Sequence, residues 1–227
     1  MQHTSSSGFI LINKLPGPTS HTIINQLRRI TSIKKIGHAG TLDPFASGLL
    51  LVAIGRESTK KINQFVKLDK EYIATAYLGA TTNTYDREGE IQKYNYTKMP
   101  DQKEIENILK KFIGKQKQIP PMFSAKKIKG KKLYELARKG IEIKRQPSDI
   151  EIFSIEFLEY HWPMLKIKVH CSSGTYIRTL AHDIGQALGC GAYLEELERI
   201  SIGKFNVKNS ILLEKITDKN WQELIFS

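Results

Sequence analysis

Apolar residues recur along the chain with two different periods, which predicts a mixture of helices and strands. Ile23, Ile24, Leu27 and Ile30 follow helical spacing, as on a helix that buries one face. Residues 70–79 instead follow the alternation that is typical of a strand, whose successive side chains point to opposite faces. We therefore expect both types of element in one core.

The same two patterns give the other elements and a fold class. A short, continuously apolar run at 49–54 predicts a buried strand. Further strands are expected at 9–12, 149–160 and 164–171, and further helices at about 58–66, 101–114, 133–140, 177–188 and 211–227. We see no repeat and no domain linker. The prediction is an α+β fold in a single domain over residues 1–227.

One loop, residues 37–48, combines a defined shape with candidate chemistry just before the buried strand. Its three glycines allow positive φ angles or close approach of another segment, and Pro44 pushes Asp43 into an extended conformation. A single carboxylate held on a loop beside a rigid strand can serve catalysis. Asp-Pro pairs also mark ordinary turns, so this pattern alone leaves both interpretations open.

Positive charge is concentrated in one segment of the chain. The 227 residues carry a formal net charge of +12, and residues 110–145 hold thirteen Lys or Arg against Glu135 and Glu142, a local net charge of +11. Such a run is often only a solvated helical face. Here prolines and aromatic residues, among them Phe123 and Tyr134, lie between the basic residues, which favours contact with the phosphates and bases of RNA.

Composition also argues against several classes of protein. No stretch of eighteen apolar residues exists, and residues 1–8 are polar and lack a hydrophobic signal region, so neither a membrane span nor export is indicated. Cys171 and Cys190 fit a reducing compartment and match no metal-ligand spacing. We therefore expect a cytoplasmic protein that binds no metal.

Several segments resemble those of one family, the TruB family of bacterial tRNA pseudouridine-55 synthases, and the resemblance spans nearly the whole chain. The loop at 37–48 is similar to the family's catalytic motif, residues 118–142 to its RNA-gripping insertion, and residues 172–180 to the segment that carries its active-site arginine. Three positions depart from the family pattern, namely Leu15 for proline, Asn83 for aspartate and Glu198 for arginine. The matching residues include Lys14, Gly17, Thr19, Ser20, Gly37, His38, Gly40, Leu42, Asp43, Pro44, Tyr72, Asp86, Arg178 and Leu197.

This resemblance implies a pseudouridine-synthase fold, with a mixed, largely antiparallel sheet flanked by helices. It also implies an isomerase that acts on uridine 55 of the tRNA T-arm without a cofactor. It implies that Asp43 is the catalytic carboxylate, that Tyr72 stacks on the uracil, and that Arg178 is an active-site arginine. The implied substrate-binding residues are His38, Lys14, Leu197, Asp86, Lys126, Lys129, Lys131 and Lys132. Longer members append an RNA-binding PUA domain, for which too few residues remain here. We expect a monomer whose partner is tRNA, gripped by a basic insertion at about 110–145.

The position of Arg178 supports part of this picture on physical grounds. An arginine in the first turn of a helix opposes the helix macrodipole, so it should have an anionic partner, and Asp43 is the candidate. Burial would raise the pKa of Asp43, and the guanidinium of Arg178 would then lower it.

Two other functions remain as alternatives. His182-Asp183 resembles the pair of the metal-dependent HD phosphohydrolases, with His38 or His170 as further ligands, but that class needs a mostly helical bundle. A non-catalytic RNA-binding module would also explain the charge and the aromatic residues. The joint presence of Asp43, Tyr72 and Arg178 favours the isomerase over both.

Overall fold

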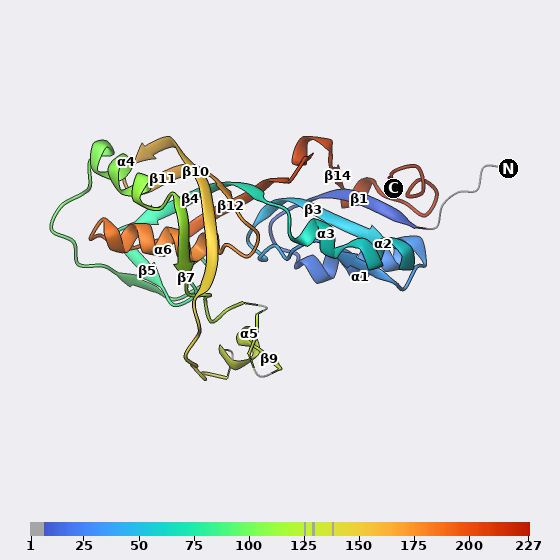
Figure 1. Cartoon of the computed structure of the whole chain (residues 1–227), viewed down its shortest axis with the longest axis horizontal. Coiled ribbons are helices and arrows are strands. Elements are labelled where there is room, and N and C mark those ends of the chain that lie inside the picture. The colour runs from blue at the N-terminus through green and yellow to red at the C-terminus, as the bar shows by residue number, and fades with distance from the viewer. Residues whose placement is uncertain (1–6, 125, 129, 138) are drawn as a thin grey trace. The chain divides into compact units, whose positions relative to one another are not determined.

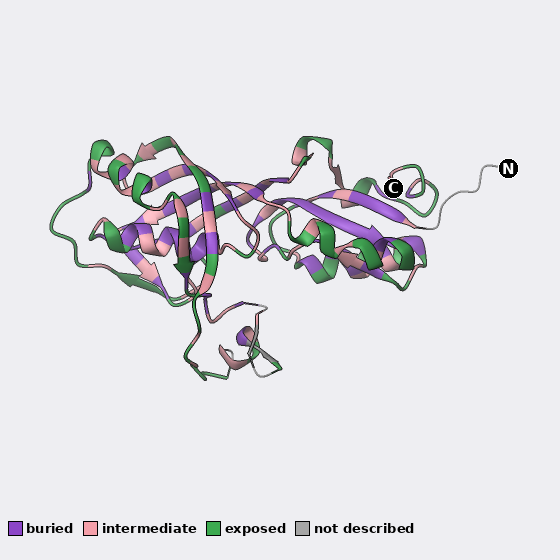
Figure 2. Cartoon of the chain, viewed as in Figure 1, coloured by how far each residue is buried: buried purple, intermediate pink, exposed green. Residues whose placement is uncertain are grey.

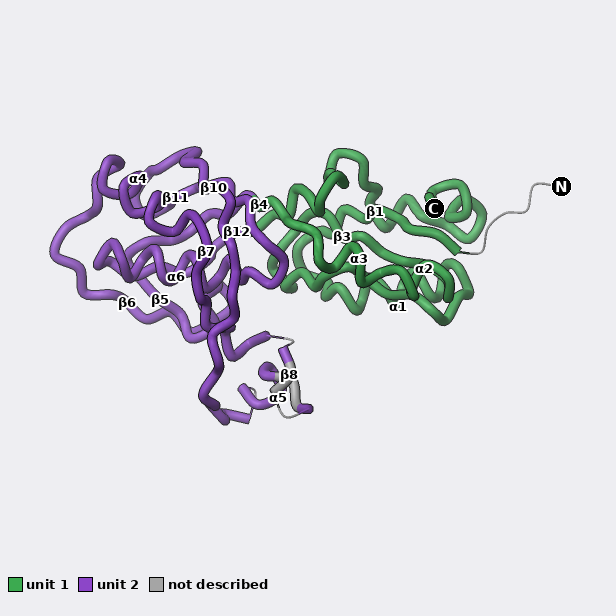
Figure 3. The backbone as a smooth tube through the Cα atoms, viewed as in Figure 1, with its two compact units in different colours: residues 1–72, 197–227 green, residues 73–196 purple. Residues whose placement is uncertain are grey.

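The computed structural model describes residues 7–124, 126–128, 130–137 and 139–227. These residues form two compact units (Figure 3). Unit 1 combines the chain up to Tyr72 with the segment Leu197–Ser227, and unit 2 is Ile73–Glu196. The chain passes between the units along two strands, β4 (Lys70–Leu78) and β12 (Ala192–Ile202). None of the helices in the described part of the chain is long and apolar enough to cross a membrane.

Unit 1 is built on strands in the order β14-β1-β3-β12 (Figure 1). Strands β1 and β3 are antiparallel, whereas β14 pairs with β1 and β12 pairs with β3 in the parallel sense. Two short strands complete this part of the sheet, β2 on β3 and β13 on β12. The bounds are β1 (Gly8–Lys14), β2 (Ile36–His38), β3 (Ser47–Ile54), β13 (Phe205–Asn206) and β14 (Ile211–Leu212).

Both faces of β3 are covered, which explains its unbroken apolar sequence (Figure 2). Leu50, Val52 and Ile54 belong to one apolar cluster with residues of α1 (Ser20–Thr31). The alternate side chains of β3 belong to a second cluster, against which Phe65 of α3 (Asn63–Val66) packs. Helix α2 (Arg56–Lys61) precedes α3, so the single helix predicted at 58–66 is two short ones.

The prediction of a helix over 211–227 is wrong. This segment forms β14, a 3-10 turn at Leu213–Lys215 and further turns, and Phe226 makes a bridge to Phe9. Its apolar residues Ile216 and Trp221 join the α1 cluster. The spacing of these two residues therefore reflects packing against the N-terminal part of the chain, and it does not reflect the period of a helix.

Unit 2 contains strands in the order β4-β11-β10-β7, of which β10 pairs in the antiparallel sense with both β11 and β7. Two separate hairpins, β5–β6 and β8–β9, are also antiparallel. The bounds are β5 (Ala80–Thr82), β6 (Ile91–Lys93), β7 (Gly114–Gln118), β8 (Lys127–Ile128), β9 (Lys131–Lys132), β10 (Ser148–His161) and β11 (Met164–Cys171). Together with the helices, this mixed and mostly antiparallel pairing confirms the predicted α+β class.

Three helices of unit 2 fall where the sequence predicts them, namely α4 (Gln102–Lys111), α5 (Leu133–Ala137) and α6 (Ile177–Ala187). Helix α4 begins with a capping box, in which the side chain of Asp101 accepts from the backbone N–H of Glu104 and the Glu104 side chain accepts from that of Asp101. Ile105 and Leu109 form its buried stripe.

Candidate active site

Asp43 lies on an irregular loop between two paired strands of unit 1. His38 of β2 is opposite Val52 of β3, and the backbone N–H of Ala39 donates to Leu51 at 2.9 Å. The chain then leaves the sheet until β3 begins at Ser47. A turn follows Asp43 directly, since the N–H of Ala46 donates to the Asp43 carbonyl at 3.2 Å. Asp43 itself is half-buried.

The residues on each side of Asp43 are fixed by the start of α1. The buried hydroxyl of Ser20 accepts from the N–H of Leu42 at 2.9 Å and donates to the Leu42 carbonyl at 3.1 Å. On the other side, the N–H of Gly17 donates to the Pro44 carbonyl at 2.8 Å. The segment 14–20 therefore serves as a template for the Asp43 loop, despite the exposed Leu15 at the position where proline is usual.

Lys14 is part of the same support. Its side chain is fully buried, and its ammonium donates to the carbonyls of Pro44 at 3.1 Å and Ala46 at 2.6 Å. A buried ammonium is costly unless oxygens satisfy its donors, so these contacts hold the loop closed around the cation. In this structure the Lys14 side chain binds the backbone of the loop, and its predicted contact with the substrate stays a prediction.

His38 offers a polar atom that the described residues leave open. Its Nδ1 is buried and has no hydrogen-bond partner there. Burial lowers the pKa of His38, and the nearby Arg199 cation lowers it further, while a hydrogen bond to the backbone of Gly40 opposes both. The ring is therefore neutral at physiological pH, and a neutral imidazole can bind a polar group of a ligand without carrying charge.

Tyr72 and Leu197 also belong to unit 1, and both are mostly buried. Tyr72 lies on β4 and Leu197 on β12, and each side chain is 8% exposed. The hydroxyl of Ser47, at the end of the Asp43 loop, lies 3.5 Å from the Leu197 carbonyl. Their roles at a target base stay predictions.

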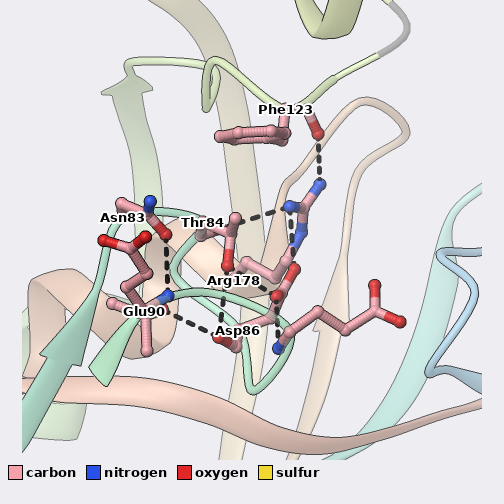
Figure 4. A network of polar contacts seen from close by, with 8 residues as sticks. Asn83, Thr84, Asp86, Glu90, Phe123 and Arg178 are labelled. Carbon is pink, nitrogen blue, oxygen red and sulfur yellow. Dashed lines mark hydrogen bonds and ion pairs between the residues drawn. The ribbon is translucent and has the colours of Figure 1, made fainter. Parts of the chain in front are cut away.

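Arg178 is the centre of a polar network in unit 2 (Figure 4). Only 4% of it is exposed, and its guanidinium pairs with the Asp86 carboxylate at 3.0 Å. It also donates to the carbonyls of Thr84 at 3.2 Å and Phe123 at 2.8 Å. The other carboxylate oxygen of Asp86 accepts from the Thr84 hydroxyl at 2.7 Å and the N–H of Glu88 at 3.0 Å.

This network shows which groups surround Arg178 and Asp86 within unit 2. Arg178 has an anionic partner within unit 2, the carboxylate of Asp86. Asp86 is 3% exposed and its carboxylate oxygens bind groups of unit 2, so it holds Arg178, and its contact with the substrate stays a prediction. The pairing of Arg178 with Asp43, which belongs to unit 1, stays a prediction.

Asn83, which stands where the family pattern has aspartate, has a local structural role. Its side-chain oxygen accepts from the N–H of Glu90 at 3.1 Å and so closes the turn between β5 and β6. An amide performs this task as well as a carboxylate.

The base of the basic insertion is tied to the start of α6. The Gln118 side chain both accepts from the N–H of Tyr176 at 2.8 Å and donates to its carbonyl at 3.0 Å. Of the predicted RNA-binding lysines, Lys126 donates to the Ser148 hydroxyl, Lys131 and Lys132 form β9, and Lys129 lies outside the described residues. Phe123 also belongs to the insertion, which therefore binds Arg178 through a backbone carbonyl.

The residues of the phosphohydrolase alternative are placed differently. His182 stacks on Tyr85, with ring centroids 4.0 Å apart. Among the described residues, no three His, Cys, Asp or Glu side chains lie close enough together to hold a metal ion.

Comparison with known proteins identifies the family. A family model described as TruB family pseudouridylate synthase (N terminal domain) matches residues 28–177, and a second, described as tRNA pseudouridylate synthase B C-terminal domain, matches residues 178–224. The chain belongs to the TruB family.

This chain aligns with several TruB relatives over most of their length. A protein named tRNA pseudouridine synthase B from Protochlamydia amoebophila is 49% identical over 204 residues, 90% of this chain and 77% of the relative. Relatives of the same name from Chlamydia abortus and Clostridium tetani are 48% and 46% identical, over 86% and 75% of their lengths.

Solved structures agree on the fold. A chain of a Cbf5-Nop10-Gar1 complex matches with a TM-score of 0.74 and 32% identity over 97% of this chain. A chain of an H/ACA RNP bound to a substrate RNA containing 2′-deoxyuridine matches with a TM-score of 0.70 and 30% identity over 95% of this chain. This chain spans 57% and 55% of those two chains.

The TruB motifs led to most of these residues, but not to Arg199. This arginine lies in β12, a strand that the apolar periodicity did not reveal, and its side chain is 1% exposed. The signal that could have revealed it is a basic residue with Leu197 and Ser201 at alternate positions on the same side of a strand, because a buried arginine there needs partners.

Proposed function

We propose that this protein is a tRNA pseudouridine synthase that isomerises uridine 55 in the T-arm stem-loop, with Asp43 as its catalytic carboxylate. Membership of the TruB family supports the reaction, and the names of the bacterial relatives support tRNA as the substrate. The observation that carries the assignment of Asp43 is the loop that holds it: the backbone of both neighbours is bonded to α1 or the segment before it.

The reaction breaks the bond between ribose C1′ and uracil N1, turns the base and joins C1′ to C5, while N1 gains the proton that C5 loses. No atom is added and no redox change occurs, so the reaction needs no cofactor. An ionised carboxylate can stabilise or trap the sugar, add to the base, or remove a sugar proton. Each of these roles needs Asp43 fixed close to the nucleoside in a site with little water.

The other site residues have roles that fit their surroundings. Tyr72 stacks on the uracil, and the neutral His38 contacts the RNA around the flipped nucleotide. Arg178, whose guanidinium is held by Asp86, is the active-site arginine. Lysines of the insertion bind phosphates, which offsets the few kcal/mol needed to unstack a base. The enzyme works as a monomer in the cytoplasm.

A paired RNA substrate tests the proposal. The wild-type protein is incubated with an unmodified T-arm stem-loop and with the same RNA carrying cytidine at position 55, and pseudouridine is detected by chemical labelling and primer extension. We expect one new stop, at position 55, in the uridine RNA alone. Binding of both RNAs without product would identify a binding module, and product at another uridine would contradict the assignment of position 55.

A further inference from the structure

Arg199 binds the backbone at both ends of the Asp43 loop. Its Nε donates to the carbonyl of Leu49, where β3 begins, at 2.8 Å. Its NH2 donates to the carbonyl of Gly40, where β2 has ended, at 3.1 Å. These two carbonyls lie on opposite sides of Asp43 in the sequence, so one planar guanidinium fixes the separation of the two ends of the loop.

The backbone of Arg199 is as closely fitted as its side chain. Arg199 is opposite Gly48 where β12 and β3 pair in parallel. A Cβ on Gly48 would lie 2.3 Å from the Arg199 carbonyl oxygen, and the φ of Gly48 is +100°. Only glycine fits there, which brings β12 directly against the end of the loop.

The charge of Arg199 has no carboxylate to balance it. No ion pair to this residue exists within 4.0 Å in the part of the chain that the structure describes, and its hydrogen bonds go to carbonyl oxygens. A merely structural link would not need a guanidinium there, because burying a charge without a counter-charge is costly. The cation also raises the electrostatic potential at the loop, as its effect on His38 shows.

We propose that Arg199 is a positioning residue of the active site, which sets the geometry of the Asp43 loop from β12 and adds positive potential beside it. This proposal rests on the function proposed above. It assigns to Arg199 an effect on the chemical step that exceeds any effect on RNA binding, since its side chain is buried and its guanidinium binds the two ends of the loop.

The test compares Arg199→Lys and Arg199→Met with the wild type under single-turnover conditions, and measures RNA affinity separately by fluorescence anisotropy. Methionine keeps the length and removes the charge and both donors, whereas lysine keeps the charge and can satisfy part of the carbonyl pair. We expect rates in the order wild type, R199K, R199M, with R199M slowed about tenfold to a hundredfold, as for a misplaced catalytic group. RNA affinity should stay within about twofold.

Arg28→Met is the matched control. Arg28 also donates through Nε to a backbone carbonyl, that of Lys34 at 3.1 Å, but it lies in the last turn of α1 and its partners Lys34 and Asn25 are not loop residues. We expect R28M to keep the wild-type rate with bound RNA. Circular dichroism at the assay temperature shows which variants are folded.

A second variant serves if R199M does not fold. Gly40→Ala leaves Arg199 intact but strains the backbone at φ +106°, where the added Cβ meets only Arg199 NH1 at an ordinary 3.5 Å. It should lower the rate and leave affinity unchanged.

The proposal is overturned if folded R199K and R199M both react at the wild-type rate, or if their loss lies in RNA affinity with the bound rate unchanged. Should the wild type itself form no pseudouridine, the proposed function fails instead, and the two failures are thereby distinguished.

Discussion

Two buried arginines, one in each unit, solve the problem of a buried charge in different ways. Arg178 pairs with the carboxylate of Asp86 and donates to two carbonyls besides. Arg199 is even less exposed, and among the described residues its side-chain bonds go to carbonyls without a carboxylate. The first arrangement is a nearly neutral unit that fixes a side chain. The arrangement at Arg199 instead places a net positive charge against the loop that carries Asp43. Such a charge favours the ionised form of a nearby carboxylate.

The largest expected effect comes from breaking the compensated pair. Asp86→Asn removes one charge of a buried ion pair and keeps the shape of the side chain, so the Arg178 guanidinium loses the carboxylate at 3.0 Å. We expect the free energy of unfolding to fall by about 3–5 kcal/mol, measured by urea denaturation. Asn83→Ala, in the neighbouring turn, is the control and should cost less than about 1 kcal/mol.

A double variant sharpens this prediction. Because the cost of D86N arises from the remaining cation, adding Arg178→Gln should restore part of the lost stability. Independent, additive losses from the two substitutions would show that the pair is not coupled.

Arg199→Met should cost somewhat less stability than D86N, about 2–4 kcal/mol. It removes a buried charge together with its desolvation penalty, but it leaves the carbonyls of Gly40 and Leu49 without this donor. Urea denaturation of both variants in parallel gives the comparison. A larger loss for R199M than for D86N would reverse the order that charge compensation predicts.

The sequence predicted more of this molecule where contacts are local than where they are distant. Helices α1 and α4 and strand β3 follow from the spacing of their own side chains, since each buries a face that its own period defines. The prediction for the C-terminal segment was wrong because Trp221 belongs to an apolar cluster whose other members lie mostly in the N-terminal part of the chain, far away in the sequence.

The candidate site divides in the same way. The Asp43 loop was found from its own glycines and proline, and Arg178 from a local motif. Arg199 was missed, because its partners Leu49 and Gly40 are 150 and 159 residues away and no local pattern records such contacts. The burial of Lys14 and Asp86 could not be predicted either. A motif does not show whether its charged residue faces a substrate or binds another part of the protein.

A smaller effect is expected from the hydroxyl that templates the loop. Ser20→Ala leaves the N–H and the carbonyl of the buried Leu42 without this partner, which should cost about 1–3 kcal/mol. Thr59→Ala removes an exposed hydroxyl bonded to the Arg56 carbonyl at 3.0 Å in the same unit, and its loss should stay within about 0.5 kcal/mol. Equal losses in thermal or urea unfolding would remove Ser20 from the support of the loop.

The smallest effect concerns a partly buried carboxyl, that of Asp183 on α6, which has no ion pair among the described residues. Burial raises its pKa from 3.8 to about 6. Because the pKa is higher in the folded state, the folded protein binds this proton more tightly. This contribution to stability is therefore full below about pH 4 and is lost as the pH rises through 6.

Asp183→Asn should remove the loss of stability that ionisation of this carboxyl causes above about pH 6. We expect the variant to be more stable than the wild type by about 1–2 kcal/mol at about pH 7.5, after allowance for partial solvent screening, and to show no such gain at about pH 4. Urea denaturation at the two pH values measures both. A gain that is the same at both would show that the carboxyl is not strained by burial.

The most direct test of the central claim is the release of tritium from C5 of uridine in T-arm RNA, with enzyme in excess, by the wild type, Asp43→Asn and Asp218→Asn. Asp218 is an exposed carboxylate of the same unit outside the loop. We predict that the wild type and D218N release the tritium at the same rate, whereas D43N binds the RNA as tightly and releases none above the enzyme-free background. Release by D43N at a rate close to that of the wild type would contradict the account.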